Sequence, residues 1–141
     1  MTFGRPGLFV DLAAELLSRG HRVRFRAPGT SMRPAILDGD AITVEPVRPL
    51  KIRADDVLLY RGEQRVFAHR VVGVAWEGEA GAVFALRGDV AGSADERVGS
   101  GQILGRVIAV ERRNRAARLF EAARLRARRL AGLMERTGGR R

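Results

Sequence analysis

VFAHRVVGV, residues 66–74, is rich in valine and carries apolar side chains over most of its length. Valine and phenylalanine favour extended backbone, and the stretch fits either an alternating strand or a strand buried on both faces. A break of polar residues and glycine, Arg61-Gly62-Glu63, stands before it. We therefore expect a long β-strand here, close in the chain to the strand that precedes it.

Similar strand-like stretches recur on both sides of this one. Residues 41–44 follow the turn Asp38-Gly39-Asp40, and residues 57–60 follow Asp55-Asp56. Further stretches of this kind lie at 21–26, 83–86 and 103–110. Strands joined by such short breaks pair antiparallel, because parallel strands need a long crossover connection. The predicted fold class is mainly β, with antiparallel sheets that close on one another.

The two ends of the chain have helical periodicity. Apolar residues recur at helical spacing from 8 to 19, with Pro6 just before them and Gly20 as a stop signal. From 114 to 135 an apolar stripe lies beside arginines, which is typical of a basic amphipathic helix. The predicted organisation is an N-terminal helix and first strand (1–27), a β body (28–111) and a basic C-terminal helix with a frayed end (112–141).

The chain is long enough for one domain and has no cysteine. Disulfides, thiolate metal sites and cysteine nucleophiles are therefore excluded, and we expect neither a metal nor a cofactor. Asp11 and Glu15 interrupt the first apolar stretch, and no other run approaches the roughly 18 uncharged residues of a membrane span. We expect no signal peptide and no transmembrane helix, and a location that is cytoplasmic or peripheral to the membrane.

Positive charge is concentrated at the C-terminal end. The net charge is +10, and residues 111–141 hold eleven arginines against three acidic residues. An Arg-rich helix can lie on an anionic membrane or bind nucleic acid, and it can equally be an ordinary solvated helix. Of the two partners we expect the membrane surface before nucleic acid, because no helix-turn-helix pattern precedes the β body.

Ser31 stands in a turn-rich break, APGTSMRP, at residues 27–34. A serine nucleophile needs a base within hydrogen-bond reach and backbone amides directed at the developing oxyanion. Gly29 lets the backbone bend beside Ser31, Pro34 stiffens the far side of the turn, and the Ser31 amide is a natural oxyanion donor. On these grounds alone, a turn serine without chemistry is the commoner interpretation.

His69 and two aspartates supply the other groups that such chemistry needs. The ring of His69 must find polar partners or face a cleft, and a near-neutral imidazole can take the serine proton. A carboxylate would hold the ring in the required tautomer, and Asp89 and Asp95 are both candidates. Each residue also has a structural interpretation, as a satisfied core histidine or a turn-forming aspartate. His21 is assigned no role.

Taken in order, these segments resemble the type I signal peptidases. The similarity extends from about residue 28 to residue 110. It rests on Gly29-Thr30-Ser31-Met32-Arg33-Pro34, Gly39-Asp40, His69-Arg70-Val71, Gly88-Asp89 and Gly105-Arg106-Val107. Members of this family use either lysine or histidine as the base, and a His-Arg-Val box is typical of the endoplasmic-reticulum and archaeal branch. The single lysine, Lys51, lies outside that box, so the chain resembles the Ser-His branch.

The resemblance implies a fold and a set of roles. The fold is a coiled set of antiparallel strands that forms a groove for an extended peptide. Ser31 is implied as the nucleophile, His69 as its general base and Asp95, ahead of Asp89, as the group that orients the histidine. Further implied are catalytic support from Asp89, Gly29 and Thr30, and substrate contacts from Met32 and Pro34. The chain departs from the family in lacking a membrane anchor and in having Val90-Ala91 in place of two asparagines.

The expected function is a serine endopeptidase of the signal peptidase type, which cuts a protein or a precursor peptide after small residues. The alternative is a catalytically silent peptide-binding or regulatory module, whose Arg-rich tail binds nucleic acid or an anionic membrane. Cleavage that depends on Ser31 and His69 would distinguish the two.

Overall fold

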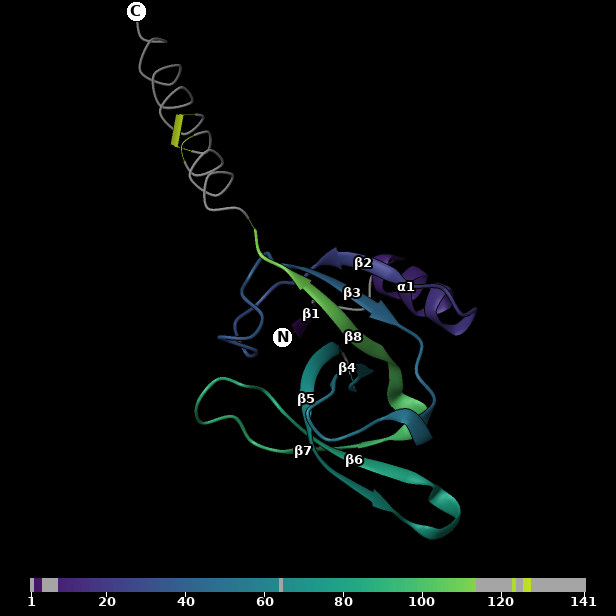
Figure 1. The fold of residues 1–141 in the computed structure, drawn as a ribbon. Coiled ribbons are helices and arrows are strands. Elements are labelled where there is room, and N and C mark those ends of the chain that lie inside the picture. Colours follow the sequence, from purple (N-terminus) through teal and green to yellow (C-terminus); the bar gives the residue numbers. More distant parts are fainter. Residues whose placement is uncertain (1, 4–7, 64, 114–122, 124–125, 128–141) are drawn as a thin grey trace, which may run out of the picture.

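The computed structural model describes residues 2–3, 8–63, 65–113, 123 and 126–127 (Figure 1). Within them the chain forms a predominantly β structure with one short N-terminal helix, which confirms the mainly β prediction. The strands are β1 (Thr2–Phe3), β2 (Val23–Arg26), β3 (Ala41–Glu45), β4 (Val57–Arg61), β5 (Val66–Trp76), β6 (Ala82–Arg87), β7 (Glu96–Gly99) and β8 (Ile103–Glu111), and the helix is α1 (Leu8–Ser18). The predicted basic helix at 114–135 falls almost entirely outside the described residues and stays a prediction.

All the strands belong to one antiparallel sheet. Its order is β2-β3-β8-β4-β5-β6-β7, and β1 pairs separately with β5. Sequence patterns did not reveal β1 or β7. The first has two residues, and in the second only Val98 is buried, so neither carries a readable alternation.

The sheet is bent rather than flat, as Figure 1 shows. Register shifts interrupt three of its ladders, between β3 and β8, between β4 and β8, and between β5 and β6. Such irregularities bend a strand and increase its twist. The long strand β5 therefore pairs with β4 over its first half and with β6 over its second half.

The two faces of the sheet carry two separate cores. Because side chains alternate along a strand, β4 and β5 contribute to both. The first core contains Leu17, Ala27, Met32, Ile36, Ile42, Val44, Leu59, Val66 and Ala68. The second contains Ile52, Leu58, Tyr60, Val71, Ala82, Phe84, Leu86 and Val98.

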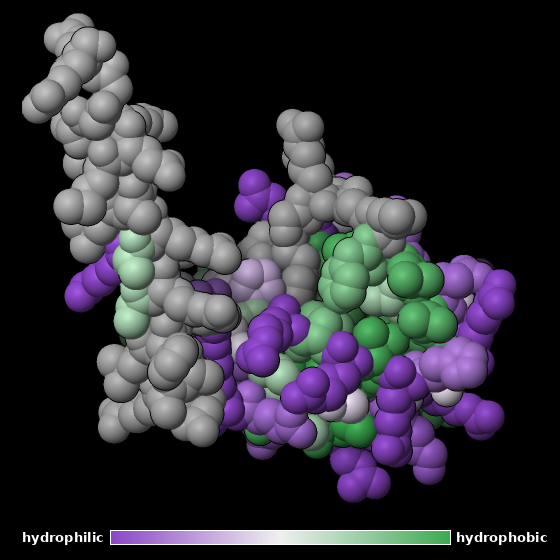
Figure 2. Space-filling view, turned by 90° about the horizontal axis from the view of Figure 1, so that it is seen from above, coloured by the Kyte–Doolittle hydropathy of each residue, from purple (hydrophilic) through white to green (hydrophobic). Residues whose placement is uncertain are grey.

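Helix α1 covers one end of the first core. Leu17 and Ala13 face inward, and the ring of Phe9 packs edge to face against Phe25 of β2, with the ring centroids 5.6 Å apart. Figure 2 shows apolar side chains gathered on this side of the molecule. Phe9 and Leu12 remain 55% exposed there.

The segment Gly105-Arg106-Val107, one of those that carry the family resemblance, has a structural role in the sheet. Gly105 lies where β8 crosses β3, and a Cβ atom on it would stand 2.5 Å from the carbonyl oxygen of Glu45 and 2.6 Å from Val44 Cγ1. The neighbouring Arg106 forms ion pairs with Glu45 at 3.0 Å and with Asp56 at 3.4 Å. This segment therefore holds strands together rather than taking part in chemistry.

We predict that Gly105→Ala lowers the free energy of unfolding by about 1–3 kcal/mol, because the added methyl group meets backbone that cannot move without disturbing the β3–β8 ladder. Chemical denaturation measures this directly. The matched control is Gly101→Ala, because a Cβ atom at Gly101 has no neighbour within 4 Å. Equal stability of the two variants would contradict the assignment.

Candidate active site

Ser31 lies in the loop between β2 and β3, and hydrogen bonds close this loop at its base. The amide of Ala27 donates to the carbonyl of Asp40 at 2.8 Å, and the amide of Gly39 donates to the carbonyl of Ala27 at 2.8 Å. Inside the loop, the side chains of Met32 and Ile36 are buried in the first core. Ser31 therefore sits next to a rigid anchor, and its side chain is half-buried.

Asp40 fastens this loop to the end of β8. Its side chain is completely buried, and its carboxylate accepts hydrogen bonds from the amide of Leu37 at 2.8 Å and from the amide of Arg113 at 3.4 Å. A buried carboxylate is stable only when its oxygens are paired in this way. The Gly39-Asp40 pair therefore has a structural role.

The family resemblance implies supporting or substrate-binding roles for four residues of the loop. Met32 was expected to contact substrate, but its side chain is 0% exposed, so it is a core anchor instead. Pro34 follows a cis peptide bond and is exposed, as a substrate contact requires. The amide of Gly29 donates to Asp38 at 2.8 Å, so it is not an oxyanion donor. Thr30 is exposed, and its carbonyl accepts from the amide of Arg33 at 3.1 Å.

His69 reaches Ser31 from the middle of β5. It pairs with Leu58 of β4, and its half-buried ring lies on the side of the second core. Its Nε2 is 3.3 Å from Ser31 Oγ. The structure thus brings together two predicted residues that are 38 positions apart in the chain. This is a long hydrogen bond, as is common in catalytic pairs without substrate, which tighten when the substrate binds.

Gly88 allows this approach. A Cβ atom on it would stand 2.7 Å from the carbonyl oxygen of Ser31 and 3.4 Å from His69 Nε2. Beyond Gly88, the amide of Val90 donates to the same Ser31 carbonyl at 3.0 Å. The loop that follows β6 therefore holds the backbone of Ser31 in place.

The loop that follows β6 also lines a cavity of about 330 Å³. Its walls are residues 87–93 together with Val72 of β5. Val72, Val90 and Ala91 make part of the wall apolar, and Gly88 connects it to the Ser31–His69 pair. The cavity is thus next to the candidate chemistry.

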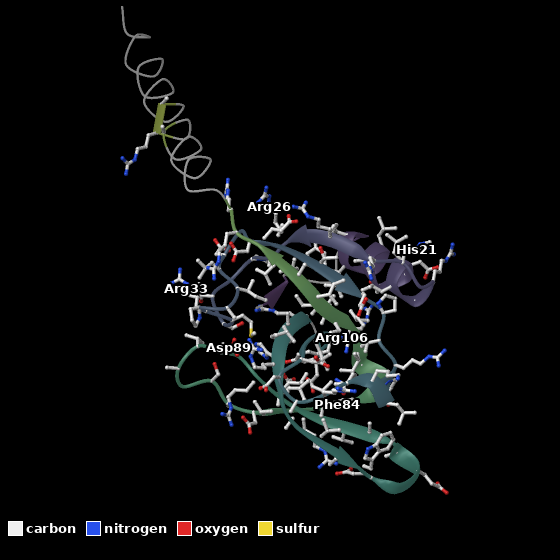
Figure 3. The ribbon with its side chains drawn as sticks, viewed as in Figure 1. His21, Arg26, Arg33, Phe84, Asp89 and Arg106 are labelled. Carbon is white, nitrogen blue, oxygen red and sulfur yellow. The ribbon has the colours of Figure 1, made fainter. Side chains whose placement is uncertain are left out.

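Asp89 and Asp95 have different partners from each other. Asp89 accepts two hydrogen bonds from Arg70, at 2.8 and 2.7 Å, which tie the loop to β5. Asp95 is half-exposed and pairs with Arg87 at 2.5 Å. Hydrogen bonding to Arg87 lowers the pKa of the Asp95 carboxyl. Figure 3 labels Asp89, on the same side of the molecule as Arg33 of the Ser31 loop, whereas His21 lies far away beside α1.

The group bonded to the other nitrogen of His69 is Tyr60, whereas Asp95, for which this place was predicted, pairs with Arg87. The hydroxyl of Tyr60 lies 3.0 Å from His69 Nδ1, and it donates to Glu96 Oε2 at 2.5 Å. Sequence reasoning missed both residues. A signal for Tyr60 was present, because a tyrosine buried in a strand needs a partner for its hydroxyl. Glu96 offered no such signal.

Burial governs the charge state of this group. It lowers the pKa of His69 to about 4, against the attraction of the Glu96 and Asp89 carboxylates. Burial, together with the hydrogen bond to Glu96, raises the pKa of Tyr60 far above its usual range. Both rings are therefore neutral at pH 7, so His69 is in the form that can accept a proton.

The chain matches no protein-family model, and comparison with curated proteins found no match. Over the described residues, no helix has the length and apolar character needed to cross a membrane. In the same part of the chain no three His, Asp or Glu side chains are grouped so that they could hold a metal ion. The interpretation of the site therefore depends on its own geometry.

We predict that His69 titrates with a midpoint near pH 4, because its ring is removed from water. Histidine ring signals followed by NMR from pH 3 to pH 8 measure this midpoint, and a His69→Gln variant assigns the signal. A midpoint near the ordinary value of 6.5 would show that the ring is solvated and that the site geometry is wrong.

Proposed function

We propose that this protein is a serine endopeptidase of the signal peptidase type. The observation that supports this most strongly is the 3.3 Å separation of Ser31 Oγ from Nε2 of a half-buried His69. The resemblance of the sequence around both residues points to the same chemistry. We also propose that the sheet has the coiled β-fold of signal peptidase catalytic domains.

The reaction has two halves. Ser31 Oγ attacks the carbonyl carbon of the scissile peptide bond while His69 Nε2 takes the hydroxyl proton, and the imidazolium then gives this proton to the leaving amine. The C–N bond breaks, and the acyl group stays on Ser31 as an ester. Water then attacks the ester while His69 Nε2 takes a proton from it. The bond between the acyl carbon and Ser31 Oγ breaks, and the imidazolium returns the proton to Oγ, which releases the acid and restores the serine.

The negative oxygen of each tetrahedral intermediate needs donors. The backbone N–H of Ser31 is the candidate on this chain, because none of the hydrogen bonds among the described residues uses it. The Gly29 amide is occupied by Asp38.

The cavity beside Gly88 supports a preference for substrates with small or modest apolar side chains next to the cut. Val72, Val90 and Ala91 form an apolar wall, and Gly92 has open space beside it for peptide backbone. The substrate class is thus an extended segment of a protein or a precursor peptide. Binding to an anionic membrane or to nucleic acid remains a prediction, because most of the Arg-rich segment that would bind them lies outside the described residues.

Ser31→Ala and His69→Ala are each expected to reduce cleavage by several orders of magnitude, because the two groups act as a unit. The assay is digestion of a peptide library, read by mass spectrometry. The control is His21→Ala, which changes the other histidine, an exposed one. Undiminished cleavage by Ser31→Ala would refute the catalytic assignment, and no cleavage by the wild type would favour the silent peptide-binding module.

The same assay gives a pH profile. Since the neutral imidazole is the base, kcat/KM should rise with pH through about 4 and level off before neutrality. A rate that stays constant from pH 3 to pH 7 would contradict His69 as the base.

Gly88→Ala should impair cleavage without unfolding the protein. Its methyl group would stand 2.7 Å from the Ser31 carbonyl, so the backbone beside the nucleophile must shift. A displacement of about 1 Å in a catalytic group can cost about 100-fold in rate, and we expect a loss of at least tenfold in kcat/KM. Gly101→Ala serves as the matched glycine control. Full activity of Gly88→Ala would show that the loop after β6 does not position Ser31.

A further inference from the structure

We infer that Tyr60 and Glu96 are positioning residues that hold His69 in the tautomer with its proton on Nδ1, which leaves Nε2 free to accept the proton of Ser31. The inference rests on the proposed function, because it concerns how the same histidine is prepared to act as a base. It assigns to a phenol backed by a carboxylate the role that Asp95 was expected to fill.

Three strands bring these groups together. His69 of β5 pairs with Leu58 of β4, and Tyr60 lies one pleat further along β4, so both rings are on the same face of the sheet. The ring centroids are 5.9 Å apart. Glu96 begins β7 opposite Leu86 of β6, and from there its carboxylate reaches the Tyr60 hydroxyl.

The hydrogen bonds leave one arrangement of protons. A carboxylate has no proton to give, so the Tyr60 hydroxyl donates its single proton to Glu96 across 2.5 Å. The phenol oxygen then faces His69 Nδ1, 3.0 Å away, as an acceptor. A neutral imidazole has one N–H, which must therefore be on Nδ1. Nε2 keeps its lone pair and directs it at Ser31 Oγ, 3.3 Å away.

This arrangement also serves the charged form of the ring. When His69 takes the serine proton, the imidazolium keeps the hydrogen bond from its Nδ1–H to Tyr60. The hydrogen bond to Glu96 polarises the phenol, so that its oxygen is a stronger acceptor for the charged ring. The electrostatic attraction of Glu96 already opposes the effect of burial on the pKa of His69. Tyr60 stays protonated throughout because burial and Glu96 raise its pKa. The phenol thus orients and stabilises the ring and does not exchange protons with it.

Asp95 is the competing candidate, and its contacts differ. Its side chain is 49% exposed, and its carboxylate is bound to Arg87. Among the groups whose charge acts on His69 are Glu96 and Asp89, and Asp89 is itself engaged by two hydrogen bonds from Arg70. The two explanations therefore make opposite predictions for Tyr60 and Asp95 variants.

The test is two-bond ¹H–¹⁵N NMR of histidine-labelled protein at pH 7, which reports which ring nitrogen carries the proton and needs no substrate. We expect Nδ1–H for His69 in the wild type. In Tyr60→Phe the proton loses its acceptor, and the ring should shift towards the Nε2–H form. In Asp95→Asn the ¹⁵N shifts of His69 should stay as in the wild type. A wild-type Nε2–H form, or a tautomer that changes in Asp95→Asn and not in Tyr60→Phe, would overturn the inference.

Kinetics supply the second readout. Because the wrong tautomer points a proton at Ser31, Tyr60→Phe should lower kcat/KM by about 100-fold to 10,000-fold, by analogy with loss of the orienting group in other serine enzymes. Thermal unfolding checks that the variant is folded, since Tyr60 also stacks on Phe67 at 5.6 Å. A folded Tyr60→Phe with wild-type kcat/KM would also overturn the inference.

Variants of Glu96 distinguish its effect on the tautomer of His69 from its effect on the pKa of His69. Glu96→Gln keeps an oxygen that can accept from Tyr60, so the Nδ1–H tautomer should persist, while loss of the charge should move the titration midpoint of His69 to lower pH. Glu96→Ala removes the acceptor, and a larger fall in kcat/KM than in Glu96→Gln is expected. A midpoint that rises in Glu96→Gln would contradict the proposed role of the carboxylate.

The inference and the proposed function can fail separately. If cleavage depends on Ser31 but the NMR tautomer is wrong, the positioning role fails and the peptidase proposal stands. If Nδ1–H is found but no cleavage depends on Ser31, the peptidase proposal fails, and the hydrogen-bonded chain is a structural feature of the second core.

Discussion

The antiparallel register of β4 against β5 is the constraint on which the rest of this structure depends. With Leu58 opposite His69, the odd residues of β5 from Phe67 to Val71 share a face with Leu58 and Tyr60, and the even ones share a face with Leu59. A slip of one residue would exchange the two sets. It would push the imidazole into the apolar first core. The packing of two cores therefore enforces the position of His69.

Two polar anchors then bring the loops to that histidine. Buried Asp40 holds the Ser31 loop to the end of β8, and the Arg70–Asp89 pair holds the loop after β6 to β5. Between them, Gly88 permits a contact that any side chain would block. Exposed ion pairs are worth little, but pairs that are partly buried and doubly hydrogen-bonded also fix geometry. Much of the site is thus made of residues that hold others in place.

The environment of His69 combines burial with polar partners. Burial alone would favour a neutral ring but leave open which nitrogen carries the proton. The hydrogen bonds of the second core restrict that choice, and the carboxylates of Glu96 and Asp89 limit how far burial can lower the basicity of the ring. An imidazole in this environment stays unprotonated from mildly acidic to neutral pH, and its Nε2 lies 3.3 Å from Ser31 Oγ.

Local sequence was sufficient for helix α1, for most of the strands and for two residues of the candidate site. Valine-rich stretches bounded by Gly and Asp predicted β2, β3, β4, β5, β6 and β8, because alternation and turn chemistry are properties of neighbouring residues. Ser31 and His69 stood out through the short motifs around them, and these motifs also suggested Met32 and Asp95 for roles that the contacts do not bear out. The sequence could not show which carboxylate or hydroxyl faces His69 Nδ1. That depends on how β4, β5 and β7 pack together, and it involves residues up to 36 positions apart. Strand register and loop approach are long-range consequences of core packing, so Tyr60, Glu96 and the necessity of Gly88 could be recognised only in the folded chain.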